Sequence, residues 1–321
     1  MASTGIPAVR VERAFVDELF DRPLLDLVHE AAMVHRQHHA PDRVQCSQLL
    51  SIKTGGCPEN CGYCSQSVHH QGEVKREPLL AVDQVLAQAK AARDGGADRF
   101  CMGAAWRQVK DGPEFDRVLE MVRGVKELGL ESCVTLGMLQ PEQAERLKDA
   151  GLDYYNHNLD TGRSHYSTIV GTHSYDDRLE TLRGVRSAGL KTCSGGILGM
   201  GESPRARAEL LYELASLDPP PESIPINNLV PIAGTPLGDV EPADWSDVVR
   251  VIAVARMLAP RSVLRLSAGR GELDEAAQAL CFLAGANSIF CGEELLTTPN
   301  PALGADSALL EKLGLKSLSR C

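Results

Sequence analysis

Three cysteines lie within eight residues near the start of the chain: Cys57, Cys61 and Cys64. Their C-x3-C-x2-C spacing, in a short loop with Pro58 and Gly62, suits the wrapping of an iron–sulfur cluster, because cysteine thiolates are its usual protein ligands. A [4Fe-4S] cube normally takes four such ligands. A set of three leaves one iron free for a substrate or cofactor, so the spacing predicts a catalytic cluster.

A structural zinc site is the alternative interpretation of the same thiols. Such sites usually pair a C-x2-4-C segment with a second pair of Cys or His ligands, and His69 and His70 follow the loop. Two adjacent histidines rarely reach one tetrahedral metal together. The three-thiol loop therefore favours the iron–sulfur interpretation.

A repeating pattern follows the cysteine loop: a helical segment, a glycine near its end and a short apolar strand. Glycine fits the left-handed conformation that ends many helices. The pattern, with the run before the loop, predicts strands at 48–53, 98–103, 130–137, 152–158, 190–196, 224–230, 263–267 and 286–291. Eight strands alternating with helices indicate an α/β fold, a (β/α)8 TIM-type barrel, with a doubly wound open sheet as the alternative. Either topology places functional residues at the C-terminal ends of the strands.

Apolar residues recur at three-and-four spacing over residues 11–40, which predicts a helix before the first strand. We therefore expect an N-terminal helical extension at residues 1–40 and a barrel domain at residues 41–321. The end of this helix is rich in histidines, at positions 29, 35, 38 and 39. These could bind a metal, but a solvated helix end is the favoured interpretation.

The composition indicates which binding partners and which cellular compartment to expect. The 321 residues include 33 Lys and Arg against 43 Asp and Glu, a net charge of −10 with no long basic run, which disfavours a nucleic-acid partner. Ten cysteines in a long chain without an apolar leader indicate metal binding or catalysis rather than disulfides. No apolar stretch is long enough to span a membrane. A cytoplasmic protein fits these features.

Three further cysteines lie at nearly the same depth on three predicted strands. Cys101, Cys133 and Cys193 each follow a helix-ending glycine by four or five residues, and Arg265 is a charged residue inside an apolar strand. These side chains would converge if all four faced the barrel interior. The residues alone leave two interpretations open: a second metal site, or buried cysteines that behave as small apolar side chains beside an arginine paired with a carboxylate.

The first cysteine loop resembles the signature of the radical S-adenosylmethionine (SAM) enzymes, in which an aromatic residue, here Tyr63, precedes the last cysteine. The resemblance implies that the open iron binds the amino and carboxylate groups of SAM. It also implies that the reduced cluster cleaves the sulfonium to give a 5′-deoxyadenosyl radical. The protein would then position these groups and exclude side reactions.

Five longer segments resemble one family within that superfamily, the biotin synthases: residues 51–59, 99–106, 154–161, 265–270 and 295–301. This resemblance implies radical insertion of sulfur into dethiobiotin, the last step of biotin biosynthesis. It also implies a [2Fe-2S] cluster, the expected sulfur donor. The catalytic residues that it implies are the ligands of the two clusters: Cys57, Cys61 and Cys64 for [4Fe-4S], and Cys101, Cys133, Cys193 and Arg265 for [2Fe-2S].

The same resemblance implies roles for residues between the clusters. The residues expected to bind the SAM cofactor are Tyr63, Ala104, Asn158, Asp160 and Ile197. Those expected to bind dethiobiotin are Asn158, Asn227, Thr297 and Thr298. Taken singly, these residues are more typical of turns or packing than of ligand contacts, and the matched segments favour the ligand role. The resemblance further implies a homodimer and an electron donor such as flavodoxin.

The chain departs from the family pattern at residues 171–173, which read Gly-Thr-His where relatives often carry Thr-Thr-Arg. A histidine is only partly charged at neutral pH, so a cationic role at this position is left open. The remaining cysteines match no ligand position, and we expect them to be structural or incidental: Cys46, Cys281, Cys291 and Cys321.

Two rival functions fit parts of the sequence. Another radical SAM barrel enzyme, without sulfur insertion, would need the first cysteine loop but not the set formed by Cys101, Cys133, Cys193 and Arg265. A plain electron-transfer protein would need four cysteines for each cube and no substrate-binding barrel, so the three-thiol loop argues against it.

Overall fold

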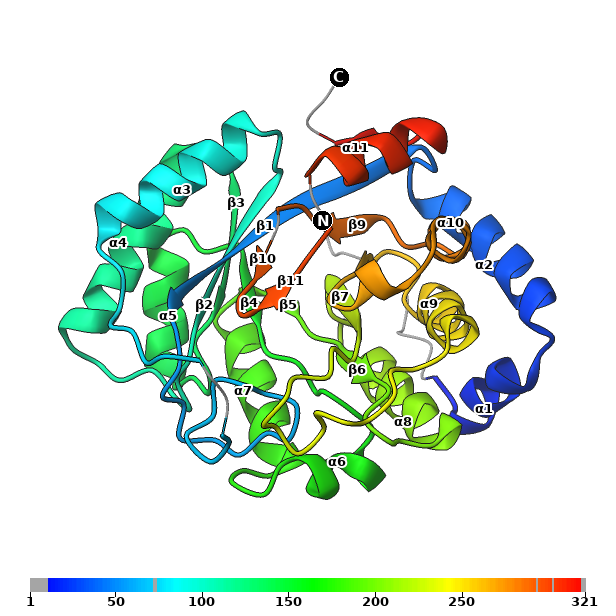
Figure 1. Cartoon of the computed structure of the whole chain (residues 1–321), viewed down its shortest axis with the longest axis horizontal. Helices are drawn as coiled ribbons and strands as arrows, with labels where there is room; N and C mark the ends of the chain where they lie inside the picture. Colours follow the sequence, from blue (N-terminus) through cyan, green and yellow to red (C-terminus); the bar gives the residue numbers. More distant parts are fainter. Residues whose placement is uncertain (1–10, 72–73, 293, 302, 319–321) are drawn as a thin grey trace, which may run out of the picture.

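A closed barrel of eight parallel strands forms the centre of the molecule (Figure 1), a computed structural model that describes residues 11–71, 74–292, 294–301 and 303–318. The barrel strands are β1 (Arg43–Lys53), β2 (Arg99–Ala104), β3 (Glu131–Thr135), β4 (Tyr154–Asn156), β5 (Lys191–Cys193), β7 (Ser223–Asn228), β8 (Val263–Leu266) and β9 (Ser288–Phe290). Each pairs with the next in this order, and β9 pairs with β1, which closes the barrel. The predicted (β/α)8 TIM-type fold is confirmed, and the open sheet is excluded.

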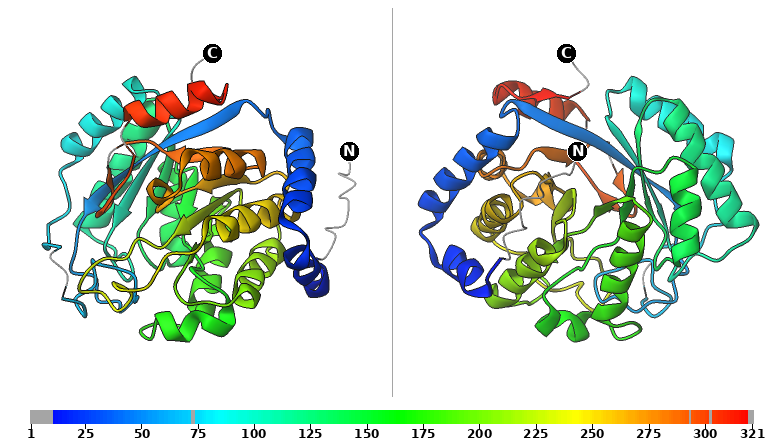
Figure 2. Two further views of the ribbon diagram at one scale, coloured as in Figure 1. Left: turned by 45° about the vertical axis from the view of Figure 1, so that its right-hand side comes forward. Right: turned by 180° about the vertical axis from the view of Figure 1, so that it is seen from behind.

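Helices cover the outside of the barrel (Figures 1 and 2). They are α3 (Val82–Asp94), α4 (Pro113–Glu127), α5 (Pro141–Asp149), α6 (Arg163–Ile169), α7 (Tyr175–Ser187), α8 (Pro204–Ser216), α9 (Trp245–Leu258) and α10 (Glu275–Leu283), with a short 3₁₀ helix, η1 (Arg270–Glu272). Proline occupies the first turn of α4, α5 and α8, where its missing N–H costs no hydrogen bond. No helix in the described part of the chain combines the length and apolar surface of a membrane span.

The C-terminal part adds small elements around the barrel rim. A hairpin of β10 (Glu294–Leu295) and β11 (Thr298–Pro299) follows β9, and then come α11 (Leu303–Lys312) and β12 (Lys316–Ser317). β12 pairs in parallel with the start of β1. β1 therefore extends five residues further toward the N-terminus than the prediction of 48–53.

The fifth barrel strand is broken, whereas the sequence predicted one strand at 190–196. After β5 ends, β6 (Gly196–Leu198) resumes beside β7. A Cβ added at Gly195 would lie 1.9 Å from the carbonyl oxygen of Pro225, and one at Gly196 would lie 2.7 Å from that of Asp160. The two glycines thus let the backbone of neighbouring strands approach closely, which a side chain would prevent.

The helical segment before the barrel is also divided. α1 (Arg13–Asp21) and α2 (Leu24–His38) replace the single helix predicted over 11–40. Pro23 stands between them, and a proline disfavours helical conformation in the residue before it. α1 packs against α8 and α2 along α9, outside the ring of barrel helices (Figure 2).

Most buried apolar side chains lie between the strands and the surrounding helices, in two large clusters. The barrel interior holds a third, smaller cluster that includes Cys101, Cys133, Cys193 and Phe290. Barrels of this type usually fill their interior with layers of branched apolar side chains. Here the interior instead presents three thiols, which makes it a candidate site.

His35 near the end of α2 is buried and His39, which caps the helix, is half-buried, so the expectation of a solvated helix end is wrong for these two residues. The rings of His35 and His39 stack with centroids 5.2 Å apart, and Arg256 Nη1 lies 2.9 Å from His39 Nε2. Burial and the positive charge of Arg256 lower the pKa of His35 to about 3 and that of His39 to about 4. Both rings are therefore neutral at pH 7.

This pair predicts acid-sensitive stability. An unfolded histidine titrates near pH 6.5, so the unfolded chain binds more protons below that pH, and stability falls from about pH 6.5 toward pH 4. We expect His35→Phe, which cannot be protonated, to reduce the loss of unfolding free energy between pH 7 and pH 5 by about 1 kcal/mol, allowing for partial screening. Urea unfolding at both pH values measures this. The exposed His38→Gln is the control, and equal losses in wild type and His35→Phe would contradict the prediction.

Candidate active site

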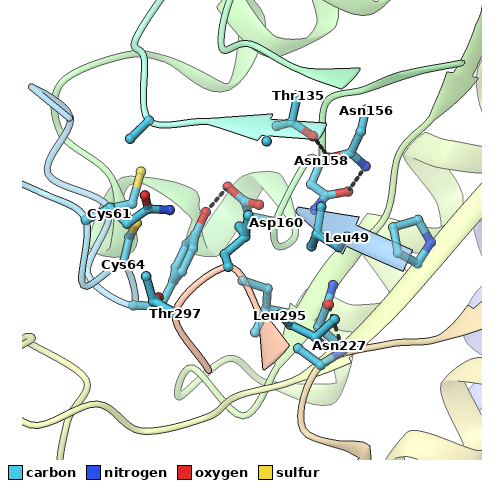
Figure 3. Close-up of a pocket in the computed structure, with 18 of the residues that line it drawn as sticks. Leu49, Cys61, Cys64, Thr135, Asn156, Asn158, Asp160, Asn227, Leu295 and Thr297 are labelled. Carbon is cyan, nitrogen blue, oxygen red and sulfur yellow. Dashed lines mark hydrogen bonds between the residues drawn. The ribbon is translucent and has the colours of Figure 1, made fainter. Parts of the chain in front are cut away.

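A cavity of about 360 Å³ lies at the C-terminal ends of the barrel strands. Its lining includes every site residue predicted from the sequence: Cys57, Cys61, Tyr63, Cys64, Cys101, Ala104, Cys133, Asn158, Asp160, Cys193, Ile197, Asn227, Arg265, Thr297 and Thr298. Figure 3 shows Cys61 and Cys64 at one side of this space, with Asn158, Asp160 and Asn227 around it. The fold therefore brings residues from all eight barrel strands, and from loops that follow them, to one enclosure.

The loop after β1 carries the first cysteine set. It begins with Gly55 and Gly56, whose φ angles of 68° and 74° favour glycine. The backbone N–H of Cys57 donates to the carbonyl of Gln66 at 2.9 Å, and the N–H of Gly62 donates to that of Ile169, also at 2.9 Å. These bonds fold the loop back on itself and attach it to α6, so the three thiols have a fixed frame without a disulfide.

The three thiols of this loop are free and poorly ionised. Burial raises the pKa of Cys61 to about 12 and that of Cys64 to about 11, and burial also raises the pKa of Cys57. Three neutral thiols around a cavity become thiolates only when a strong positive charge joins them, which a bound metal supplies. The donor set therefore fits an iron–sulfur cluster.

The structure does not support the zinc alternative. His69 Nε2 lies 3.1 Å from the carbonyl oxygen of Pro58, and His70 Nε2 lies 2.9 Å from that of Cys61. Both rings thus contact the loop backbone. Among the described residues no three His, Cys, Asp or Glu side chains are arranged around a single metal ion. A cluster of several iron and sulfide atoms spans a wider space than one ion. The wide separation of the possible ligands therefore disfavours a single zinc ion.

Glu59, between the first two cysteines, ties the loop to the residues where the chain departs from the family pattern. Its carboxylate lies 2.6 Å from His173 Nδ1, accepts a hydrogen bond from Thr172 and pairs with Arg107 at 3.3 Å. Burial acts to raise the pKa of Glu59, but the hydrogen bonds from His173 and Thr172 outweigh it and keep the pKa below its usual value. The residues at 171–173, where the chain departs from the family pattern, therefore help to position the cysteine loop. The sequence alone did not predict this contact.

Asp160 forms a second buried polar network at the cavity. Its Oδ2 accepts from Tyr63 Oη at 2.9 Å and pairs with Arg178 at 2.7 Å. Arg178 also donates to the carbonyl of Asn158 at 2.7 Å and to Tyr166 Oη at 2.6 Å. Asp160 has a φ of 66°, uncommon for a residue with a side chain. The network fixes the loop after β4 against the cysteine loop and α7, as the dashed bond in Figure 3 shows for Asp160.

The second cysteine set lies deeper in the barrel, and its thiols contact one another. Cys101 and Cys133 are register partners on β2 and β3, and Cys133 hydrogen-bonds to both Cys101 and Cys193. The bond from Cys133 lowers the pKa of Cys193 well below its usual value; burial opposes this, and the positive charge of Arg265 adds to it. Cys193 is therefore prepared to carry negative charge, whereas the hydrogen bonds to Cys101 and Cys193 raise the pKa of Cys133.

No acidic side chain among the described residues lies within ion-pair distance of Arg265. Within this part of the chain, the alternative interpretation that Arg265 pairs with a carboxylate is therefore wrong. Its Nε donates to Ser288 Oγ at 3.1 Å and its Nη2 to Ser47 Oγ at 3.0 Å, while the guanidinium carbon lies 4.5 Å from the Phe290 ring centroid. A buried arginine is usually paired with a charge. Its presence beside three thiols fits a site where negative charge accumulates.

The predicted substrate residues Asn227, Thr297 and Thr298 line the same cavity. Asn227 donates to the carbonyl of Gly196 at 2.9 Å and accepts from the N–H of Ala268 at 3.2 Å. Thr297 Oγ1 lies 3.0 Å from Ser65 Oγ, which joins the β10–β11 hairpin to the cysteine loop. Thr298 donates to the carbonyl of Leu295 inside the hairpin. The hairpin therefore covers one side of the cavity.

Some residues of the site were missed by sequence reasoning. Arg178 lies among the buried positions of α7, and an arginine on the apolar stripe of a helix was the available signal. Asn156 and Thr135 face the cavity from β4 and β3. No spacing rule distinguishes such polar side chains from ordinary strand ends.

Two family models match the chain. The Radical SAM superfamily model matches residues 51–215, and the model of the Biotin and Thiamin Synthesis associated domain matches residues 225–316. A biotin synthase from Gloeobacter violaceus is 60% identical over 301 residues, which cover 94% of this chain and 95% of the relative. A biotin synthase from Sorangium cellulosum is also 60% identical, over 94% of this chain and 86% of the relative.

Solved structures resemble the chain in fold. A methylornithine synthase (PylB) aligns with a TM-score of 0.79 at 18% identity, over 96% of this chain and 94% of that one. HydG, a maturase of the [FeFe]-hydrogenase, aligns with a TM-score of 0.82 at 17% identity, over 98% of this chain and 73% of that one. At such identities the likeness shows the barrel fold alone.

The Asp160 network predicts a large effect on stability. We expect Arg178→Met to lower the free energy of unfolding by about 3 kcal/mol, because it leaves a buried carboxylate without its cation. Asp160→Asn in the same chain should recover part of that loss. Urea unfolding measures both. Arg163→Met, which breaks an exposed pair with Asp176, is the control and should cost less than about 1 kcal/mol. An equal cost for Arg178→Met and Arg163→Met would disprove the role of the network.

Proposed function

The chain belongs to the biotin synthase family of radical SAM enzymes, and from this premise we propose how its two thiol sets share the reaction. Its function is the insertion of sulfur between two unactivated carbons of dethiobiotin to give biotin, a sulfurtransferase reaction that completes biotin biosynthesis. The family's cofactors are a [4Fe-4S] cluster, SAM and a [2Fe-2S] cluster. The observation that carries the proposal is that two separate thiol sets line one cavity.

We assign the first set to [4Fe-4S] and the second to [2Fe-2S]. Cys57, Cys61 and Cys64 would hold the first cluster, and the deeper set with Arg265 would hold the second. When bound, these groups and SAM supply hydrogen abstraction from carbon and the sulfur that replaces the hydrogen. The protein's own task is to hold the groups in reach of one substrate and to keep water out.

One guanidinium nitrogen of Arg265 makes no hydrogen bond to the described residues, which supports the assignment of the deeper set to [2Fe-2S]. A protonated guanidinium has no lone pair to offer iron, so a ligand role needs a nitrogen that can give up a proton or become strongly polarised. Its Nε and Nη2 donate to serine hydroxyls, and Nη1 donates to none of the described residues. No carboxylate among those residues lies within ion-pair distance of the guanidinium. Nη1 is thus the atom that we propose as the ligand.

The remaining residues are assigned to the two small molecules. Tyr63, Ala104, Asn158, Asp160 and Ile197 would contact SAM, with Asp160 held in position by Arg178. Dethiobiotin would contact Asn158, Asn227, Thr297 and Thr298. Asn227 already uses one N–H and one lone pair on the backbone, so it keeps one donor and one acceptor position for a ligand.

The hairpin contributes by excluding solvent. Leu295 and Leu296 line the cavity beside Thr297, and a Cβ at Gly103 would lie 2.8 Å from Leu296 Cδ2. The hairpin therefore packs closely on the end of β2. Water and other quenchers are kept from a reactive carbon centre by such apolar closure.

We propose several further features of the protein. We propose that the chain acts as a homodimer in the cytoplasm and receives electrons from a donor such as flavodoxin. We also propose residues 41–321 as the catalytic barrel domain and residues 1–40 as a helical extension, which is supported by the packing of α1 and α2 outside α8 and α9. Residues 1–10 and Cys321 lie outside the described residues.

The two ligand sets predict separable losses. Cys193→Ala should retain the [4Fe-4S] Mössbauer signal and lose the [2Fe-2S] signal, with biotin formation reduced at least a hundredfold. Cys61→Ala should lose the [4Fe-4S] signal instead. Anaerobic Mössbauer spectra and a dethiobiotin-to-biotin assay measure these effects. Cys281→Ala is the matched control, because Cys281 is a buried cysteine outside the cavity. A [2Fe-2S] signal that survives in Cys193→Ala would refute the assignment.

A further inference from the structure

Asn156 contacts the second thiol set directly. It ends β4, and Cys193 is its register partner on β5. Asn156 Nδ2 lies 3.3 Å from Cys193 Sγ and 3.2 Å from the carbonyl oxygen of Cys193. Figure 3 shows Asn156 in a row with Thr135 and Asn158 at the edge of the cavity.

The orientation of the Asn156 amide is determined by its neighbours. The carbonyl of Cys193 can only accept a hydrogen bond, so the amide must present its NH2 group to it. Thr135 Oγ1 donates to Asn156 Oδ1 at 3.0 Å, which holds the other end. A flipped amide would place its oxygen against the Cys193 carbonyl oxygen. The group that faces Cys193 Sγ is therefore an N–H donor.

We propose that Asn156 is a positioning residue for sulfur insertion: its N–H donates to Cys193 Sγ and raises the reduction potential of the [2Fe-2S] cluster. The proposal rests on the proposed function, because it takes Cys193 as a ligand. A hydrogen bond to a thiolate stabilises negative charge, and the reduced cluster carries more of it, so the donor favours reduction. Cys193 is fully buried, which strengthens the interaction.

The same amide reaches the substrate side of the cavity. Asn156 Nδ2 lies 3.3 Å from Asn158 Oδ1, and Asn158 is assigned to SAM and dethiobiotin. Asn158 Oδ1 also accepts from the N–H of Gly195 at 3.2 Å, at the break in the fifth strand. One NH2 group thus lies between the thiol of the sulfur donor and a residue that contacts the reactants.

The test is an anaerobic redox titration of the cluster-loaded enzyme, followed by the visible absorption and EPR of [2Fe-2S]. We expect the potential to shift to a more negative value in Asn156→Ala. Thr135→Val keeps the shape of residue 135 and removes only the hydroxyl that orients the amide, so it should give a smaller shift of the same sign. Thr192→Val is the matched control, because Thr192 precedes Cys193 on β5 but hydrogen-bonds to Arg186, away from the cavity. Its potential should equal that of wild type.

The outcomes separate this inference from the proposed function. If wild type holds no [2Fe-2S] cluster, or Cys193→Ala keeps it, the ligand assignment fails and the inference falls with it. If Cys193→Ala loses the cluster while Asn156→Ala titrates like wild type, only the inference is overturned. If Asn156→Ala assembles no cluster, Thr135→Val decides: a negative shift supports the hydrogen bond, and an unchanged potential overturns it.

Discussion

The register of the parallel barrel is the constraint on which the rest of the structure depends. Side chains on a strand alternate between the two faces, so a slip of one residue on β2, β3 or β5 would turn a thiol from the interior to the helices. The observed pairing of Cys101 with Cys133, and of Asn156 with Cys193, keeps all three thiols on the inner face. Closure between β9 and β1 then brings Arg265 to the same space.

Buried polar contacts hold the loops at the ends of the strands in fixed positions. Arg178 connects Asp160 and the backbone of Asn158 to α7, and Glu59 connects the cysteine loop to His173. A buried ion pair adds little net stability compared with apolar packing, yet breaking one is costly. Such pairs therefore select one loop arrangement, which a reaction between three bound groups requires.

The sequence predicted the barrel because helix-ending glycines and short apolar strands repeat along it, and these are local signals. It did not predict the break in the fifth strand, since Gly195 is required by the approach of Pro225 from another strand. His35 was misassigned to solvent because its burial depends on contacts outside α2. The hydrogen bond from Asn156 to Cys193 likewise depends on strand register. Local patterns thus predicted most of the elements and the inward-facing thiols, whereas contacts between distant segments set the polar networks.

Anomalous diffraction at the iron edge, from crystals grown without oxygen, would test the central claim most directly. The account predicts two separate iron positions on one cavity, one bounded by Cys57, Cys61 and Cys64 and the other by the deeper thiol set with Arg265. A single iron position, or iron bound away from either set, would contradict it.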